Sequence, residues 1–282
     1  KHFKVVVDGV NSTGGTFIPA LLHALGVKEV IELYCEPTGH FPHNPEPLPE
    51  NLTAISNKIK ETNADLGIVV DPDVDRLAFV CNDGSMFGEE YTLVSISDFV
   101  LQNTPGNTVS NLSSTISLRE VTEQYDGCSY EAAAVGEVNV VAKMKATNAI
   151  IGGEGNGGII YPESHYGRDA LVGSALFLTQ LAGSGLTSKE LRDTYPDYYI
   201  SKNKIQLEDG MDVDAILVDI ANQYSDKEVD TTDGVKIYFG SEWVHLRKSN
   251  TEPIIRIYSE SESEQKANGL AFEIMNKIRA LA

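Results

Sequence analysis

The chain has 282 residues, of which 41% are hydrophobic and 8% aromatic, and its formal net charge at pH 7 is −19. This length suffices for about two or three domains with buried cores. The negative charge argues against a nucleic-acid or anionic-membrane partner, because both require basic patches. Within the sequence, no apolar run approaches the roughly 20 residues that span a bilayer.

The cysteines and the first residues indicate the cellular setting. Cys35, Cys81 and Cys128 are odd in number and widely spaced, which favours reduced thiols in the cytoplasm over a disulfide or zinc framework. The chain starts on a strand pattern from Lys1 to Asp8, with neither an initiating Met nor a leader. We therefore expect it to begin inside a longer protein.

The first hundred residues alternate between strand and helix patterns. Strands are expected at 4–8, 30–34 and 66–70, and helices at 16–25, 48–63 and 92–102. Such alternation predicts an α/β domain, here residues 1–104, built on a mainly parallel sheet. Ligands of such sheets gather beyond the carboxyl ends of the strands.

The rest of the chain predicts a second α/β domain, residues 105–202, and a small α+β domain, residues 203–282. In the second, strands are expected at 108–111 and 149–152, and helices at 117–125, 139–145 and 168–181. In the third, a helix is expected at 213–224, strands at 235–239, 243–247 and 254–259, and a helix at 262–281. The predicted fold class is α/β, with two consecutive α/β domains of mixed or parallel sheets followed by a small α+β C-terminal domain.

The segment Asp71-Pro72-Asp73-Val74-Asp75-Arg76 follows the expected strand at 66–70 and places carboxylates at alternate positions. Mg²⁺ prefers oxygen ligands and shares its shell with phosphate oxygens, and an adjacent arginine binds phosphate. A calcium EF-hand is excluded, because its required glycine and glutamate would fall on Arg76 and Asn82. The segment therefore predicts a magnesium site beside a phosphate; an ordinary solvated loop is the alternative.

Two further loops carry polar groups suited to a sugar phosphate. The glycine-rich segment Gly152 to Gly158 projects Glu154 and Asn156, which suit sugar hydroxyls, although a hairpin turn without a ligand explains it equally well. The segment from Arg247 to Pro253 gathers a guanidinium, hydroxyls and backbone N–H groups, all of which are phosphate donors. A Ser/Asn turn is the alternative there.

These three loops, in this order, resemble those of the α-D-phosphohexomutase family, which includes phosphoglucomutase, phosphomannomutase and phosphoglucosamine mutase. The resemblance also rests on Val135-Gly136-Glu137 and Gly167-Arg168-Asp169. It implies a four-domain enzyme that interconverts hexose 1-phosphate and hexose 6-phosphate through a bisphosphate. In that family a phosphoserine of the first domain exchanges its phosphoryl group with the substrate.

The resemblance implies a role for each matching residue. Asp71, Asp73 and Asp75 would be ligands of Mg²⁺, and Arg76 would be the catalytic residue beside the phosphoryl group. The substrate-binding residues would be Gly136, Glu154, Asn156, Arg247, Ser249, Asn250 and Thr251, of which the last four would hold the phosphate that is not transferred.

Two departures from the family pattern matter. The family's Ser-His-Asn-Pro serine loop is absent, so we expect domains 2 to 4 only, with the phosphoserine domain as the missing partner and no turnover by the chain alone. Gly158 stands where many relatives have histidine, which leaves proton transfer open to Arg76, His165 or the absent domain. The hexose, whether glucosamine, glucose or mannose, also stays open.

Two other functions fit part of the sequence. A haloacid-dehalogenase-type phosphatase would use Asp71 and Asp73 after the apolar strand, but Asp75 is unusual there and the later loops stay unexplained. A non-catalytic sugar-phosphate-binding protein is the other alternative.

Overall fold

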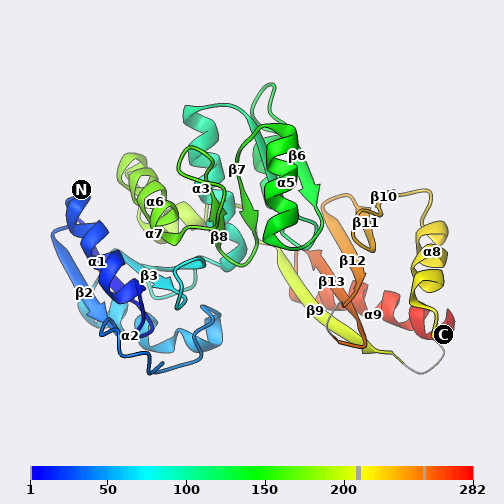
Figure 1. The fold of residues 1–282 in the computed structure, drawn as a ribbon, viewed down its shortest axis with the longest axis horizontal. Coiled ribbons are helices and arrows are strands. Elements are labelled where there is room, and N and C mark those ends of the chain that lie inside the picture. The colour runs from blue at the N-terminus through cyan, green and yellow to red at the C-terminus, as the bar shows by residue number, and fades with distance from the viewer. Residues whose placement is uncertain (1, 208–210, 250–251, 282) are drawn as a thin grey trace. The chain divides into compact units, whose positions relative to one another are not determined.

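The computed structural model describes residues 2–207, 211–249 and 252–281, which form two compact units (Figure 1). Unit 1 comprises residues 1–110, 117–132 and 136–195, and unit 2 comprises residues 111–116, 133–135 and 196–282. The predicted boundary at residue 104 lies inside unit 1, between a helix that ends at Asn103 and a strand that begins at Asn107.

The first sheet of unit 1 has the order β2-β1-β3-β4. β1 pairs in parallel with β2 and β3, whereas β4 pairs antiparallel with β3. The strands are β1 Lys4–Asp8, β2 Glu29–Leu33, β3 Leu66–Val70 and β4 Leu77–Cys81, and the helices are α1 Gly14–Ala24, the short η1 Pro49–Asn51, α2 Thr53–Thr62 and α3 Glu89–Asn103. All residues of β3 and β4 are buried, which explains their uninterrupted apolar sequences.

The second sheet has the order β6-β5-β7-β8. Its strands are β5 Asn107–Asn111, β6 Tyr130–Ala133, β7 Ala149–Glu154 and β8 Gly158–Ile160, accompanied by helices α4 Ser117–Thr122, α5 Glu137–Thr147, α6 Ala170–Ser184 and α7 Ser188–Arg192. β5 and β7 are parallel, and β7 and β8 form an antiparallel hairpin. The glycine-rich segment is therefore the turn of a hairpin.

One hydrophobic core joins the two sheets of unit 1. Phe79 of β4 and Phe177 of α6 stack with ring centroids 3.8 Å apart, and Phe87 contacts both rings edge-on. The helices α3 and α6 pack against each other between the sheets. This shared core holds the end of β3 and the β7–β8 hairpin in one body.

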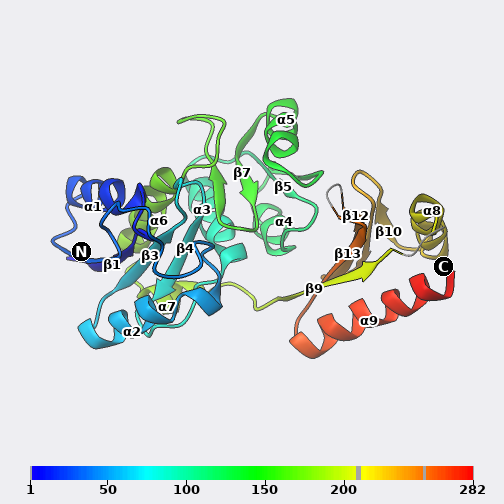
Figure 2. The ribbon, with the colours of Figure 1, turned by 60° about the horizontal axis from the view of Figure 1, so that its bottom comes forward.

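Unit 2 contains an antiparallel sheet with the order β10-β11-β12-β13-β9. Its strands are β9 Tyr199–Gln206, β10 Glu228–Asp230, β11 Val235–Phe239, β12 Glu242–Lys248 and β13 Ile254–Ser261, and its helices are α8 Val213–Gln223 and α9 Glu264–Leu281 (Figure 2). Alternate residues such as Ile237 and Leu246 form a core with both helices. The other face carries Trp243, which packs on Ile116 of the segment 111–116.

The predicted fold class is confirmed, with differences in detail. The first sheet is mixed, one of the two forms predicted, because β4 returns directly after the acidic loop as an antiparallel edge strand. The helix expected at 48–63 is interrupted at Leu52, whose backbone is not helical, after a 3-10 turn that starts at Pro49. The α+β domain has two more strands than expected, β9 and β10.

Two simpler expectations can be compared with the structure. The three cysteines are all described, and none of them forms a disulfide. Within the described residues, none of the helices combines the length and apolar composition that a membrane crossing requires.

Candidate functional site

The acidic loop follows β3 and is folded around Asp71. Its Oδ1 accepts hydrogen bonds from the backbone N–H groups of Asp75 and Arg76, each at 3.0 Å. The Val74 N–H donates to the Asp71 carbonyl at 3.2 Å, and Val74 has φ +63°, a strained value for a β-branched residue. The fold brings carboxylate oxygens of Asp71, Asp73 and Asp75 within 4.8 Å of one another.

The charges of this loop are poorly balanced by protein groups. The pKa of Asp71 is raised to about 7, mainly by burial and in the same direction by the nearby carboxylates of Asp75 and Asp73, whereas the hydrogen bond from the Arg76 N–H lowers it. The Arg76 Nε lies 3.8 Å from Asp71 Oδ2, while its Nη1 lies 3.3 Å from Glu46 Oε1. Three clustered carboxylates fit a hard divalent cation, which relieves this repulsion.

The β7–β8 turn lies directly beside the acidic loop. The Leu77 N–H, one residue after Arg76, donates to the Gly157 carbonyl at 3.1 Å. Gly157 has φ +83°, and a Cβ there would lie 2.1 Å from the Leu77 carbonyl oxygen, so only glycine fits. The loop predicted to bind the sugar is therefore a tight turn, and it packs against the loop predicted to bind the metal.

The polar groups of the turn are held by neighbours within unit 1. Glu154 is buried, and its Oε1 accepts a hydrogen bond from the Gly136 N–H at 3.1 Å. Asn156 is half-buried, and its Oδ1 accepts from the Gly158 N–H at 3.2 Å. The structure thus brings Gly136, Glu154 and Asn156 into one unit with the acidic loop.

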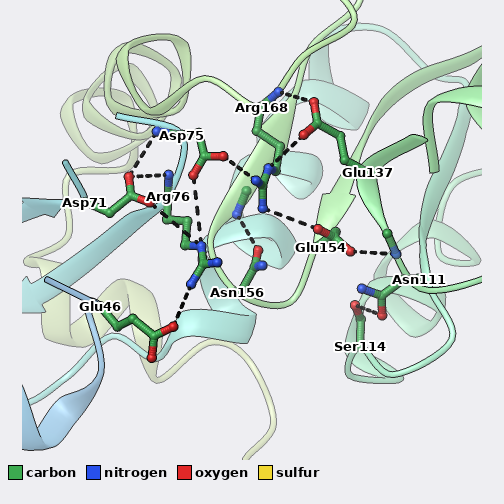
Figure 3. A network of polar contacts seen from close by, with 12 residues as sticks. Glu46, Asp71, Asp75, Arg76, Asn111, Ser114, Glu137, Glu154, Asn156 and Arg168 are labelled. Carbon is green, nitrogen blue, oxygen red and sulfur yellow. Dashed lines mark hydrogen bonds and ion pairs between the residues drawn. The ribbon is translucent and has the colours of Figure 1, made fainter. Parts of the chain in front are cut away.

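Arg168, to which the sequence pattern assigned no role, joins these parts (Figure 3). Its guanidinium pairs with Asp75 of the acidic loop, with Glu154 at 3.4 Å and with Glu137 at 3.1 Å. The one sequence feature that could have indicated Arg168 is its position between Gly167 and Asp169, because Asp169 is the N-cap of α6. His165, the other candidate nearby, has its Nε2 2.9 Å from Asp169 Oδ2.

The predicted phosphate loop belongs to unit 2, at the β12–β13 connection. Arg247 is half-buried, and its Nε is buried without a hydrogen-bond partner among the described residues. Ser249 is buried, and its N–H donates to the Ile254 carbonyl at 3.0 Å. The predicted binding residues Asn250 and Thr251 lie outside the described residues.

A neutral histidine lies two residues before Arg247. His245 has Nε2 2.6 Å from the Asp233 carbonyl and Nδ1 2.9 Å from Ser113 Oγ, so Nε2 carries the proton. Burial lowers the pKa of His245 to about 4, and the positive charges of Lys236 and Arg247 act in the same direction.

We expect His245 to make unit 2 sensitive to acid. Because the folded pKa is about 4 and the unfolded value about 6.5, its contribution is complete above pH 6.5 and is lost as pH falls towards 4, by about 3 kcal/mol in total. Denaturant unfolding followed by Trp243 fluorescence between pH 7.5 and 4 would measure the loss. His245→Gln should remove this part of the pH dependence; an unchanged profile in the variant would contradict the assignment.

Comparison with known proteins identifies the domain types. The family descriptions phosphoglucomutase/phosphomannomutase alpha/beta/alpha domain II, alpha/beta/alpha domain III and C-terminal domain match residues 1–84, 88–198 and 203–277. Those three domains in that order define a mutase-type architecture. The family's domain I is not matched.

Individual relatives agree with these matches. A phosphoglucomutase/phosphomannomutase of Thermococcus kodakarensis is 38% identical, covering 93% of this chain and 58% of the relative. A probable phosphoglucosamine mutase of Methanopyrus kandleri is 33% identical, covering 98% of this chain and 61% of the relative. The crystal structure of a phosphoglucomutase/phosphomannomutase family protein from Burkholderia thailandensis has a TM-score of 0.86 at 27% identity, covering 99% of this chain and 60% of that one.

The chain belongs to the phosphoglucomutase/phosphomannomutase family, and it spans about three fifths of the length of the curated relatives it matches. The phosphatase alternative is not supported, because the family matches extend over the loops at 153 and 247 that it left unexplained.

Proposed function

We propose that the chain is the metal- and substrate-binding part of a cytoplasmic phosphohexomutase, which interconverts hexose 1-phosphate and hexose 6-phosphate through a bisphosphate. The observation that carries this proposal is the meeting, within unit 1, of the three-carboxylate cluster, Arg76 and the β7–β8 turn. A phosphoserine of a separate first domain would be the phosphoryl donor and acceptor.

In this proposal, Asp71, Asp73 and Asp75 hold Mg²⁺. The donor set supports this, because it is all oxygen and anionic and leaves room for phosphate oxygens. The cation, when bound, neutralises charge on the phosphoryl group. Arg76 then supplies a second positive charge at the same place, and phosphoryl transfer is catalysed mainly by such positioning and charge stabilisation.

The remaining predicted residues orient the sugar phosphate. The Glu154 carboxylate accepts hydrogen bonds from sugar hydroxyls, the Asn156 amide donates to them, and the Gly136 N–H holds Glu154 in place. Arg247 and Ser249, together with Asn250 and Thr251, bind the phosphate that is not transferred. The Nε of Arg247 is buried and has no hydrogen-bond partner among the residues that the structure describes, which supports this role because a phosphate oxygen would satisfy it.

The hexose is tested by titration calorimetry. The relatives above are named for glucose, mannose and glucosamine phosphates, so all three 6-phosphates should be titrated into the chain with Mg²⁺. Binding of at least one, with none for the free hexoses, supports the proposal and ranks the substrates. Failure of all three, both in the chain and in a longer protein that includes a serine-loop domain, would refute it.

We expect these 282 residues alone to bind a hexose phosphate without turnover. Their sequence contains no Ser-His-Asn loop, and therefore no family phosphoserine to exchange the phosphoryl group. The measurement is ³¹P NMR of glucose 1-phosphate incubated with the purified chain and Mg²⁺. Formation of glucose 6-phosphate in proportion to the chain would show that another residue transfers the phosphoryl group.

A further inference from the structure

The side chain of Arg168 pairs both with Asp75 of the acidic loop and with Glu154, the residue before the β7–β8 turn. The side chain is 15% exposed, and its guanidinium pairs with three carboxylates from different elements: Asp75 after β3, Glu137 in the first turn of α5 and Glu154 at the end of β7. In sequence, Asp75 and Arg168 are 93 residues apart. The planar guanidinium spreads its donors over three nitrogens and so reaches partners in different directions, whereas the three donors of an ammonium all lie on one nitrogen.

The backbone around Arg168 is fixed to the same two loops. The Asp169 N–H donates to the Ile159 carbonyl of β8 at 2.8 Å, and the Ala170 N–H donates to the Val74 carbonyl of the acidic loop at 3.1 Å. The Arg168 N–H itself lies 3.3 Å from Glu137 Oε1. The position of the Arg168 side chain is therefore fixed by backbone hydrogen bonds at one end and by the ion pairs of its guanidinium at the other.

Gly158 gives the Arg168 side chain its path. A Cβ at position 158 would lie 2.4 Å from Arg168 Cδ and 3.1 Å from Cγ. The backbone of Gly158 has no positive φ, so an alanine there would be opposed by the arginine stem, and next by Asn156 Oδ1 at 3.1 Å, rather than by backbone strain. The Arg168 side chain thus occupies the space that a side chain at position 158 would need.

We propose that Arg168 is a positioning residue that orients Asp75 for the cation and Glu154 for the sugar, so that the two loops keep one fixed geometry. This inference rests on the proposed function, because it assigns how the proposed metal and sugar ligands are held. Mutation of a group that orients a metal ligand typically weakens metal affinity by roughly 10- to 100-fold.

The direct test is Arg168→Lys, which keeps the positive charge and removes the fork. Titration calorimetry of Mg²⁺ into the chain should show an affinity about tenfold weaker than that of the unchanged protein. Because the charge is retained, the loss reports orientation and not electrostatic attraction. An affinity equal to that of the unchanged protein would overturn the proposal and leave Arg168 as a simple counter-charge.

Arg192→Lys is the matched control for loss of folding. Arg192 lies in the same unit and also uses its fork, donating from Nε to the Phe87 carbonyl at 2.8 Å and from Nη1 to the Tyr195 carbonyl at 3.2 Å. The Arg192→Lys variant should have lower thermal stability than the unchanged protein and the same Mg²⁺ affinity. If both lysine variants weaken Mg²⁺ equally, the effect is general loosening of unit 1 and the proposal fails.

Gly158→Ala tests the same geometry with Arg168 intact. The added methyl should displace the arginine stem and weaken Mg²⁺ binding as Arg168→Lys does. In an Arg168→Ala background the same change should have a much smaller effect, because the side chain closest to the added methyl is gone and only Asn156 Oδ1, at 3.1 Å, remains near it. Additive effects would contradict the proposal, whereas absence of Mg²⁺ binding by the unchanged protein would instead refute the metal site of the proposed function.

Discussion

Asp71→Asn is expected to stabilise the cation-free protein at pH 8 by about 4 kcal/mol and to weaken Mg²⁺ binding by about 100-fold. Asparagine retains the oxygen that accepts from the Asp75 and Arg76 N–H groups, so the loop keeps its fold. What it loses is a buried negative charge beside two others. The Asp71 carboxylate, which destabilises the cation-free protein, is therefore also one of the groups proposed to bind the cation.

The pH dependence of this effect has a definite sign. The pKa of Asp71 is about 7 in the folded protein, against 3.8 for an aspartate that is fully exposed to water. The stabilisation from protonated Asp71 is complete below about pH 4 and is lost as pH rises through 7. The advantage of Asp71→Asn should therefore grow between about pH 4 and 7 and stay constant above that.

Denaturant unfolding with a chelator, repeated with saturating Mg²⁺, measures both effects. Asp73→Asn is the matched control, because Asp73 is exposed and its replacement removes a ligand without removing a buried charge. This variant should lose Mg²⁺ affinity with little change in cation-free stability. Equal stability of Asp71→Asn and the unchanged protein at pH 8 would show that the cluster is not strained by repulsion.

Arg247→Ala is expected to weaken hexose 6-phosphate binding by about 100-fold, the loss typical of a charge-assisted contact with a desolvated group. The Nε of Arg247 is buried without a hydrogen-bond partner in the described residues, so the ligand is the partner we assign to it. Titration calorimetry with the best of the three hexose 6-phosphates measures the loss, and Mg²⁺ affinity should not change.

Arg256→Ala is the control for that experiment. Arg256 lies opposite Arg247 in the β12–β13 ladder, but its Nη2 donates to Glu252 at 2.8 Å. Its removal should change hexose phosphate affinity by less than about threefold, as expected for a partly exposed surface pair. Similar losses in both variants would mean that general charge, rather than a specific grip by Arg247, attracts the ligand.

The sequence predicted elements whose pattern is local. Leu66–Val70 is an uninterrupted apolar run and forms the strand β3 as expected, and Val235–Phe239 forms β11 with the expected bounds. β9 was missed because Tyr199–Gln206 is an outer strand of its sheet with several polar, partly exposed residues, so it lacks an apolar pattern. β4 was missed although Leu77–Cys81 is also an uninterrupted apolar run, which begins directly after Arg76.

The candidate site could be predicted only as separate loops. The spacing of Asp71, Asp73 and Asp75 is visible in the sequence, and the structure brings their oxygens together. The pairing of Arg168 with Asp75 and Glu154 depends on how α6, β8 and the acidic loop pack, which no local pattern encodes. Likewise, the reason for Gly158 appears only when the arginine stem is seen beside it.

The most direct test of the proposed function is ³¹P NMR of glucose 1-phosphate with Mg²⁺ and a protein in which this chain is joined to a phosphorylated serine-loop domain. The proposed function predicts conversion to the 6-phosphate, stimulated by glucose 1,6-bisphosphate and lost in Asp73→Asn. Release of inorganic phosphate without 6-phosphate would contradict it and indicate a phosphatase.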